Sequence, residues 1–381
     1  MNGKRISKLL TLVLLISVLT GCSANQTPQS SAPEETPSAT PSTTPTEAPT
    51  EEPSPSPSPE PTTEPDQPPV DELGENWAAV GETGREYLTY TYSGQTVYRW
   101  FSYYIPTSYE PGDQLPLMLT LHGSTSNAAM QMSDGDWVRY AEQEGFILLA
   151  PESVAIHADG TLSSEGKSMG EIQQSDMSML RWAAAATDPQ TAYGVDDVEY
   201  LCRLVDFFID SGYADASRVY ACGLSHGAYM SLRLAVEAPE KFAGVGIASG
   251  QLCYQFQDTD PLPATKIVFF QGTADYVVPI TGIANWSMSL EETVQWFLDK
   301  YGMENNPVET EMPDLAEDGM TTTRYEYDDA EGNAMIVSYI TTGGGHAWPG
   351  GKFASFSGGT TDINATELIW EELKDVSKDV E

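Results

Sequence analysis

The residues with the clearest chemical potential lie in one pentapeptide, Gly223-Leu224-Ser225-His226-Gly227, which fits the pattern G-x-S-x-G. In this pattern the serine is a nucleophile on a strained turn between a strand and a helix, and the small glycines let the two elements pass closely. With 32 glycines in 381 residues, chance alone supplies such a match in roughly one chain in five. Other parts of the sequence must therefore support the nucleophile.

A serine nucleophile needs a base, and the chain has only four histidines. His122 and His157 lie upstream of Ser225. The side chain of His226 cannot easily turn back onto its neighbour. His346 lies downstream in "TTGGGHAWPGG", just past the last predicted strand. Order and position therefore predict His346 as the base.

The base in turn needs a carboxylate, and Asp275 in "KIVFFQGTADYVVP" follows a strand of the buried type. An aspartate there would accept the N–H of His346, fix the tautomer of the ring and stabilise the imidazolium. The alternative is a turn or capping aspartate. Asp258 and Asp260 compete for the role, but they lie in a polar stretch that no strand precedes.

An oxyanion formed at an attacked carbonyl needs two preorganised backbone N–H groups. The residue after the nucleophile, His226, supplies one in this arrangement. The loop "LHGSTSNA", which follows an early apolar strand, is expected to supply the other from Gly123 or Ser124.

These residues require elements that bring distant segments together. Near-continuous apolar runs alternate with helical patterns, which predicts right-handed crossovers and an α/β fold: a mainly parallel central sheet with helices on both faces. An alternating pattern with a turn at Ser93-Gly94 predicts an N-terminal antiparallel hairpin within residues 86–106. The strands are expected within residues 115–123, 145–153, 218–225, 242–250, 266–275 and from 334, and the helices within 195–212, 227–240 and 290–302.

The N-terminal residues 1–22 are typical of an export signal. Lys4, Arg5 and Lys8 precede an apolar run that is too short to span a bilayer. The run ends in Leu-Thr-Gly-Cys22, which resembles the lipobox of bacterial lipoproteins, in which the cysteine is lipidated. We therefore expect an extracytoplasmic protein that a lipid on Cys22 anchors to the bacterial cell membrane; the alternative is an ordinary secretory signal that contains a cysteine.

Residues 23–70 hold 14 of the 26 prolines and eight acidic residues, with no basic or aromatic residue. Such a segment buries too little apolar surface to offset its ordering entropy, so we expect a disordered tether. Residues 71–381 are long enough for one catalytic domain with a single large core. The net charge of −38 argues against nucleic acid or an anionic membrane surface as partner, and we expect a monomer.

The three remaining cysteines, Cys202, Cys222 and Cys253, have no metal-ligand spacing and no histidine nearby to act as a base. No metal site and no cysteine nucleophile are predicted from them. Their apolar contexts favour buried free thiols, although one disulfide between two of them stays open.

Together, "LTLHG", "GVDDVEYLCRLVD", "SRVYACGLSHGAYMSLRLAVEAPEKFAGVGIASG", "QGTADYVVP" and "GGGHAWPGG" resemble the poly(3-hydroxybutyrate) depolymerase-like esterases. These are related to the feruloyl and acetylxylan esterases of carbohydrate esterase family 1, and the resemblance covers roughly residues 85–372. It implies an α/β-hydrolase fold, no cofactor, and a triad of Ser225, Asp275 and His346. The chain departs from the family at His226, where relatives usually carry asparagine or glutamine, and in its few cysteines.

The sequence thus predicts a serine carboxylesterase acting on a small ester or, because a surface tether suits it, on a polymer such as ester-decorated plant polysaccharide. Candidate substrate contacts are His122, Trp182 and Trp348; packing of the histidine loop is the alternative for Trp348. A polyester depolymerase is the second candidate. A binding lipoprotein without catalytic activity, for solutes or glycans, is the alternative from another class.

Overall fold

The computed structural model describes residues 80–164, 180–259 and 264–379. The predicted signal, Cys22 and the tether lie outside the described residues. Within the described ranges, no helix is both long and apolar enough to span a bilayer.

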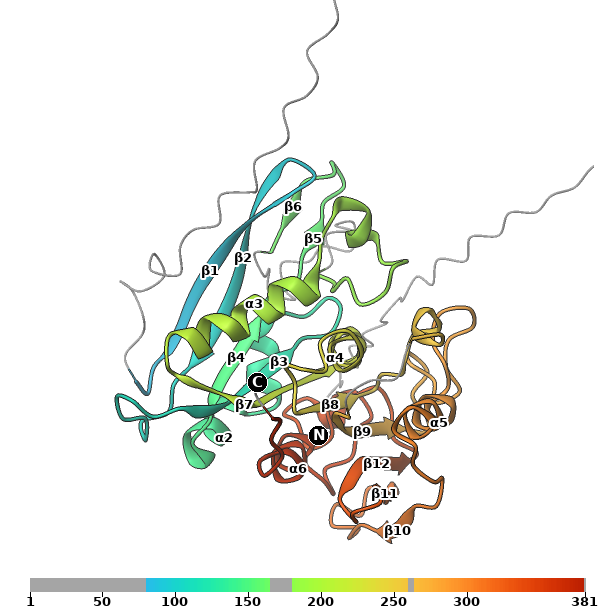
Figure 1. Cartoon of the computed structure of the whole chain (residues 1–381). Coiled ribbons are helices and arrows are strands. Elements are labelled where there is room, and N and C mark those ends of the chain that lie inside the picture. Colours follow the sequence, from blue (N-terminus) through green and yellow to red (C-terminus); the bar gives the residue numbers. More distant parts are fainter. Residues whose placement is uncertain (1–79, 165–179, 260–263, 380–381) are drawn as a thin grey trace, which may run out of the picture. The chain divides into compact units, whose positions relative to one another are not determined.

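One ten-stranded sheet organises the domain, in the order β1-β2-β4-β3-β7-β8-β9-β12-β11-β10 (Figure 1). Its six central strands are parallel to one another, which confirms the predicted α/β class. These strands are β3 (Leu115–Leu121), β4 (Ile147–Pro151), β7 (Ala214–Leu224), β8 (Gly244–Ala248), β9 (Lys266–Gly272) and β12 (Ala334–Thr342). Because they are parallel, the residues that follow them meet at one edge of the sheet.

The N-terminal edge of the sheet is the predicted antiparallel hairpin of β1 (Thr83–Tyr92) and β2 (Gln95–Tyr104). Ser93 and Gly94 both have positive φ, as a two-residue hairpin turn requires. A second, very short hairpin joins β5 (Ala155–Ile156) to β6 (Leu162–Ser163).

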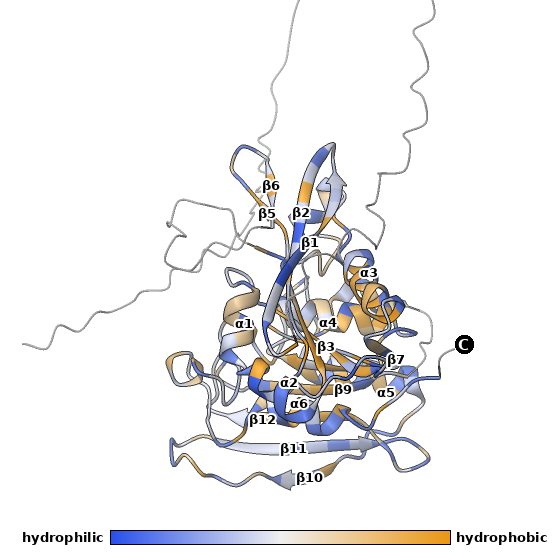
Figure 2. Cartoon of the chain, turned by 90° about the vertical axis from the view of Figure 1, so that its left-hand side faces the viewer, coloured by the Kyte–Doolittle hydropathy of each residue, from blue (hydrophilic) through white to orange (hydrophobic). Residues whose placement is uncertain are grey.

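The opposite edge carries an antiparallel extension that the sequence did not predict. It consists of β11 (Thr321–Asp328) and β10 (Val308–Glu311). All four residues of β10 are exposed, so this strand has no apolar alternation by which it could be found. Figure 2 shows the contrast between the apolar central strands and the paler, more polar β11 and β10.

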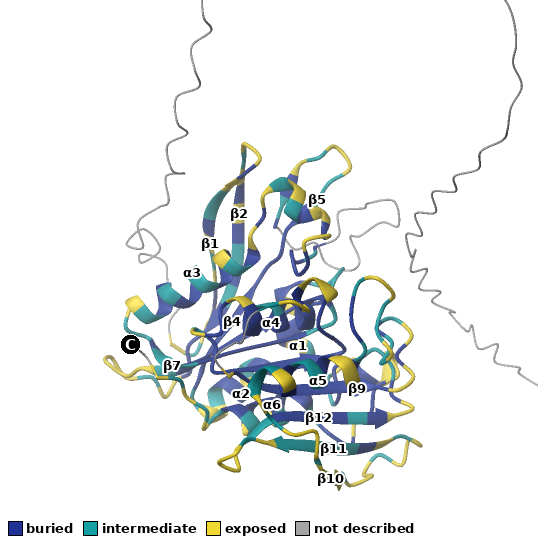
Figure 3. Ribbon diagram, turned by 45° about the vertical axis from the view of Figure 1, so that its right-hand side comes forward, coloured by how far each residue is buried: buried dark blue, intermediate teal, exposed yellow. Residues whose placement is uncertain are grey.

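Helices cover both faces of the sheet, and a separate apolar core lies under each set. The predicted helices α3 (Asp197–Asp210), α4 (His226–Glu237) and α5 (Leu290–Tyr301) pack on one face. The helices α1 (Ala128–Asp134), α2 (Trp137–Glu144) and α6 (Ala365–Leu373) pack on the other. Figure 3 shows the central strands buried between these layers. The described residues also form three short 3-10 helices: η2 (Pro189–Tyr193), η3 (Tyr254–Phe256) and η4 (Ala354–Phe356).

Candidate active site

Ser225 lies on the sharp turn between β7 and α4, as the pentapeptide predicts. Its backbone has φ 57° and ψ −120°, a region that costs free energy for any residue with a Cβ. The turn is held because the Ser225 N–H donates to the carbonyl oxygen of Ala248 at 2.9 Å. A strained serine at a strand end is the geometry of an exposed nucleophile.

The two glycines of the pentapeptide are required by close backbone contacts. A Cβ on Gly223 would lie 2.4 Å from the carbonyl carbon of Gly227, and a Cβ on Gly227 would lie 2.1 Å from the carbonyl oxygen of Leu121. No side chain fits at these distances. The helix therefore packs directly on the strands, which fixes the position of the turn.

The predicted base and acid meet across the loops that follow β12 and β9. His346 Nδ1 lies 2.8 Å from Asp275 Oδ2. The other carboxylate oxygen of Asp275 accepts the N–H groups of Val277 and Val278 at 2.9 and 2.8 Å. These bonds aim the carboxylate at the imidazole ring.

The pKa of Asp275 reflects this environment. Burial by itself would raise it, but the hydrogen bond and charge of His346, the N–H of Val278 and the hydroxyl of Ser249 outweigh burial and lower the pKa. A charged Asp275 keeps a proton on Nδ1 of His346. Nε2 is then the nitrogen left to accept a proton, as a general base must.

Backbone contacts bind the two loops together. Thr273 N–H donates to the carbonyl of Thr341 at 2.9 Å, and Ala274 N–H donates to that of Gly344 at 2.8 Å. A Cβ on Gly272 would lie 2.2 Å from the Gly344 carbonyl oxygen. Glycine in this position therefore lets the base loop approach the acid loop.

On the other side of Ser225, the loop after β3 reaches the nucleophile. A Cβ on Gly123 would lie 3.3 Å from the Cβ of Ser225. The ring of His122 is buried, and burial lowers its pKa to about 4, so the ring is neutral near pH 7. Its Nε2 accepts the N–H of Ser153 at 3.2 Å, and its Nδ1–H donates to the carbonyl of Gly123 at 2.8 Å.

This hydrogen bond fixes one peptide plane. The carbonyl of Gly123 accepts both from His122 and, at 3.2 Å, from the Ser126 N–H. Within a trans peptide the C=O and the following N–H point in opposite directions. The N–H of Ser124 is therefore directed away from the buried ring, which favours Ser124 over Gly123 as a donor to an oxyanion.

His226 begins α4, and its buried ring is engaged by the segment that precedes α3. Its Nδ1 accepts the N–H of Trp182 at 3.1 Å, and its Nε2 lies 3.4 Å from Asp188 Oδ1. The ring also stacks against Trp286, with centroids 6.3 Å apart. Since the first N–H groups of a helix lack intrahelical partners, the backbone of His226 is the part of this residue suited to the oxyanion.

Trp182 joins the loop after β3 to the start of α4. It is fully buried, its indole N–H donates to the carbonyl of His122 at 2.8 Å, and its backbone N–H donates to His226. Next to it, the Ala183 N–H donates to Asp197 at 2.6 Å. We call residues 180–188 the strap, since they connect the loop after β3 to the start of α4.

A buried ion pair supports the strap. Arg99 Nη2 lies 2.6 Å from Asp197 Oδ1, and both side chains are fully buried. The guanidinium also contacts the hydroxyl of Tyr92 and lies 3.7 Å from the ring centroid of Tyr200. Sequence reasoning missed this pair because its members are 98 positions apart and no local pattern joins them.

The three residues suggested as substrate contacts are instead buried. His122 and Trp182 hold the loop after β3 and the start of α4, as described. Trp348 is 1% exposed, donates from its indole to Thr366 at 2.9 Å and packs edge-on against Trp137. Packing of the histidine loop, the alternative considered for Trp348, matches this position.

Exposed aromatic side chains that the sequence did not single out lie close to Asp275 and His346 along the chain. Tyr276, which follows Asp275, is 77% exposed, and Phe356 in η4 is 91% exposed. The η4 segment reaches the base loop because Gly345 N–H donates to the carbonyl of Gly358 at 2.8 Å. Adjacency to Asp275 was the one signal that could have found Tyr276.

Cys202, Cys222 and Cys253 are free thiols. Burial raises the pKa of each to about 12, so none is a thiolate near neutral pH. The expectation of buried free thiols is confirmed for Cys222 and Cys253, whereas Cys202 is half-buried.

Comparisons with known proteins agree with this arrangement. The model of the prolyl oligopeptidase family matches residues 182–262, which include most of the strap, the pentapeptide and α4. A protein of Nocardia uniformis subsp. tsuyamanensis named as an esterase, NocK, is 28% identical over 62% of this chain and 67% of its own length. The poly(3-hydroxybutyrate) depolymerase of Ralstonia pickettii is 26% identical over 77% of this chain and 58% of its own. Acetylxylan esterase A of Emericella nidulans is 30% identical over 35% of this chain and 36% of its own. The chain thus spans about two thirds or less of each relative.

Proposed function

We propose that this chain, a serine ester hydrolase with the α/β-hydrolase fold, removes acetyl or feruloyl groups from plant cell-wall polysaccharide. The observation that carries the proposal is the hydrogen bond between Asp275 and His346. Both residues lie in loops that follow strands of the same sheet whose strand β7 leads directly into Ser225. The match to an acetylxylan esterase supports the choice of substrate. An ester fits better than a peptide because an alkoxide leaves more easily than an amine.

In the proposed reaction, His346 Nε2 takes the proton of the Ser225 hydroxyl as its oxygen attacks the ester carbonyl. The tetrahedral oxyanion collapses, and the alcohol leaves with the proton from His346. A water molecule then gives its proton to the same nitrogen and attacks the acyl-enzyme. The acid is released, and Ser225 regains its proton. Asp275 stabilises the imidazolium in both halves.

The oxyanion is proposed to accept the backbone N–H groups of His226 and Ser124. Both belong to peptides that buried side chains hold in place, so little reorganisation is required as charge develops. Tyr276 and Phe356 offer exposed rings beside the acid and base loops, where an aromatic acyl group or a polymer chain would contact them.

We further propose that the protein works outside the cytoplasm, with a lipid on Cys22 as its anchor and residues 23–70 as the tether. The support is the signal-like N-terminus and the proline-rich composition. Expression with radiolabelled palmitate should label the wild-type chain and leave Cys22→Ala unlabelled. Label on both chains, or on neither, would contradict the anchor.

The enzymatic test is an assay of the purified protein on p-nitrophenyl acetate, butyrate and octanoate, methyl ferulate and acetylated xylan, with Ser225→Ala alongside. We expect release of acetate or ferulate, and loss of activity in the variant. If the variant is as active as the wild type, Ser225 is not the nucleophile. If no ester is cleaved, the result favours the binding lipoprotein of the alternative class.

A polyester depolymerase is the second candidate, since the match to the poly(3-hydroxybutyrate) depolymerase covers 77% of this chain. Exposed Tyr276 and Phe356 would also suit an apolar polymer. Release of 3-hydroxybutyrate from polyhydroxybutyrate granules, without release of acetate from acetylated xylan, would favour this candidate.

A further inference from the structure

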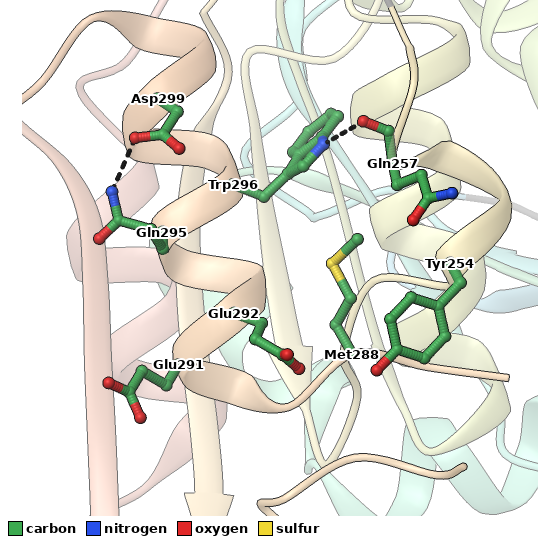
Figure 4. A pocket seen from close by; sticks show the side chains of 8 residues that line it. All are labelled: Tyr254, Gln257, Met288, Glu291, Glu292, Gln295, Trp296 and Asp299. Atoms are coloured by element: carbon green, nitrogen blue, oxygen red, sulfur yellow. Dashed lines mark hydrogen bonds between the residues drawn. The ribbon is translucent and has the colours of Figure 1, made fainter. Parts of the chain in front are cut away.

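Two pockets that no part of the mechanism uses flank α5. The first, a cavity of about 450 Å³, lies between α5 and η3. Figure 4 shows the rings of Trp296 and Tyr254 on its two sides, with Met288 between them. Tyr254 is 37% exposed, so its ring is open to a ligand.

The second pocket, of about 480 Å³, lies between α5 and the sheet. Tyr325 and Tyr327 of β11 line it from the sheet, and Leu290 and Val294 line it from the helix. Glu291 lines both pockets, so the two are neighbours on α5.

The second pocket contains a polar group without a partner. Ser338 lines it and is 3% exposed, and its hydroxyl oxygen makes no hydrogen bond to another residue. Ser338 is paired with Tyr325 in the sheet register, so the two side chains share a face. A buried hydroxyl left unpaired costs free energy, and a hydroxyl group of a ligand would satisfy it.

The lining also selects the charge of a ligand. Neither pocket is lined by lysine or arginine in the described part of the chain, whereas Glu291, Glu292 and Asp299 line the first. These carboxylates repel anions but accept hydrogen bonds from hydroxyl groups. Each pocket also has an amide side chain, Gln257 in the first and Asn305 in the second. An amide can donate hydrogen bonds to the hydroxyl groups of an uncharged sugar and accept them.

We propose that the two α5 pockets bind sugar rings of the uncharged polysaccharide that carries the esters. The C–H groups of a sugar ring lie favourably on the negative face of an aromatic ring, here on Tyr254 or Trp296 and on Tyr325 or Tyr327. The ring hydroxyls bond to Glu291, the amides and Ser338. This inference rests on the proposed function, since it names the polymer backbone that the esterase holds.

The position of the pockets suits this role. Tyr254 N–H donates to the carbonyl of Trp286, whose ring stacks against His226, the residue after the nucleophile. Ile280, which lines the second pocket, belongs to the same loop after β9 as Asp275. A polysaccharide chain bound along α5 therefore borders the loops of the triad and keeps further ester groups nearby.

The test uses xylohexaose, which carries no ester and reports on binding alone. Titration calorimetry should detect binding to the full chain and a loss of about tenfold or more in affinity for Tyr254→Ala with Tyr325→Ala. KM for acetylated xylan should rise in parallel, while kcat/KM for p-nitrophenyl acetate stays unchanged. Tyr98→Ala, which removes a 51% exposed tyrosine from β2, is the matched control and should behave as the wild type.

Glu291→Ala gives a second test at an exposed position of α5 and should also weaken xylohexaose binding. Trigalacturonate, an anionic oligosaccharide, should bind more weakly than xylohexaose; equal or tighter binding would overturn the assignment to an uncharged polymer. If the wild-type protein deacetylates xylan but binds neither xylohexaose nor cellohexaose, the sugar-binding role of the pockets is refuted and the proposed esterase function stands. Binding without any ester cleavage would do the reverse.

Discussion

On the side of Ser225 where we propose the oxyanion donors, buried side chains hold the backbone: His122, Trp182 and the ring of His226 form one hydrogen-bonded chain. On the acid–base side, the backbone holds the side chains, since loop-to-loop hydrogen bonds and the two valine N–H groups orient Asp275. The oxyanion needs a fixed N–H and no moving proton, whereas the base must change its charge in every cycle. The first requirement favours full burial, and the second favours a partly exposed ring such as that of His346, at 19%.

The largest effect is expected on the acid–base side, from Asp275→Asn. An asparagine keeps an oxygen for the valine N–H groups but cannot stabilise the imidazolium or fix the correct tautomer of His346. We expect kcat on p-nitrophenyl acetate to fall about 10,000-fold, with a thermal midpoint close to that of the wild type. Asp258→Asn is the control and should stay fully active. A loss of less than tenfold in the Asp275 variant would remove this residue from the triad.

In the buried ion pair that supports the strap, Asp197→Asn should lower the free energy of unfolding. It leaves the buried charge of Arg99 without its partner, which typically costs about 3–5 kcal/mol, and the measurement is urea-induced unfolding. The paired change Arg99→Met with Asp197→Leu should recover much of the unfolding free energy, because no charge is then buried. It should remain less active than the wild type, since a leucine side chain at position 197 offers no acceptor to the Ala183 N–H. Full recovery of activity would show that the strap is not needed.

A smaller loss of activity is expected from the contact between the strap and His226, which follows the turn at Ser225. His226→Leu removes the acceptor of the Trp182 N–H, and we expect kcat to fall about 10- to 100-fold with little change in KM, as for a misplaced oxyanion donor. His226→Asn places an oxygen near the position of Nδ1 and should retain most of the activity. Equal activity in the two variants would mean that this hydrogen bond does not position the backbone.

The smallest effect is a pH dependence of stability. Burial lowers the pKa of His122 to about 4, so its contribution is present above about pH 6.5 and is lost as the pH falls. Burial raises the pKa of Glu152, 3.5 Å from that ring, to about 7, so its contribution is present below about pH 4.5 and is lost as the pH rises. Between about pH 4.5 and pH 6.5, the two groups therefore change the free energy of unfolding in opposite directions as the pH changes.

Glu152→Gln removes the pH dependence of stability that comes from Glu152. It keeps an acceptor for the Ala128 N–H that Glu152 binds. The unfolding free energy of this variant should therefore fall by about 2 kcal/mol from pH 7 to pH 4.5, whereas that of the wild type should vary less. Urea unfolding at several pH values measures both. Parallel profiles for the two proteins would show that Glu152 does not titrate in this range.

The sequence by itself determined the central strands, the sharp turn at Ser225 and the hydrogen-bonded pair of Asp275 and His346. These depend on local signals: apolar runs, glycines and the order of residues past strand ends. Parallel pairing then brings all strand ends to one edge.

Only the tertiary structure decided which residues support that edge. The Arg99–Asp197 pair, the two bonds of Trp182 and the burial of Trp348 join positions far apart in the chain. The edge strand β10 pairs through its backbone and carries no apolar pattern. Local periodicity reports which face of an element is buried, but not which distant side chain completes a hydrogen bond there.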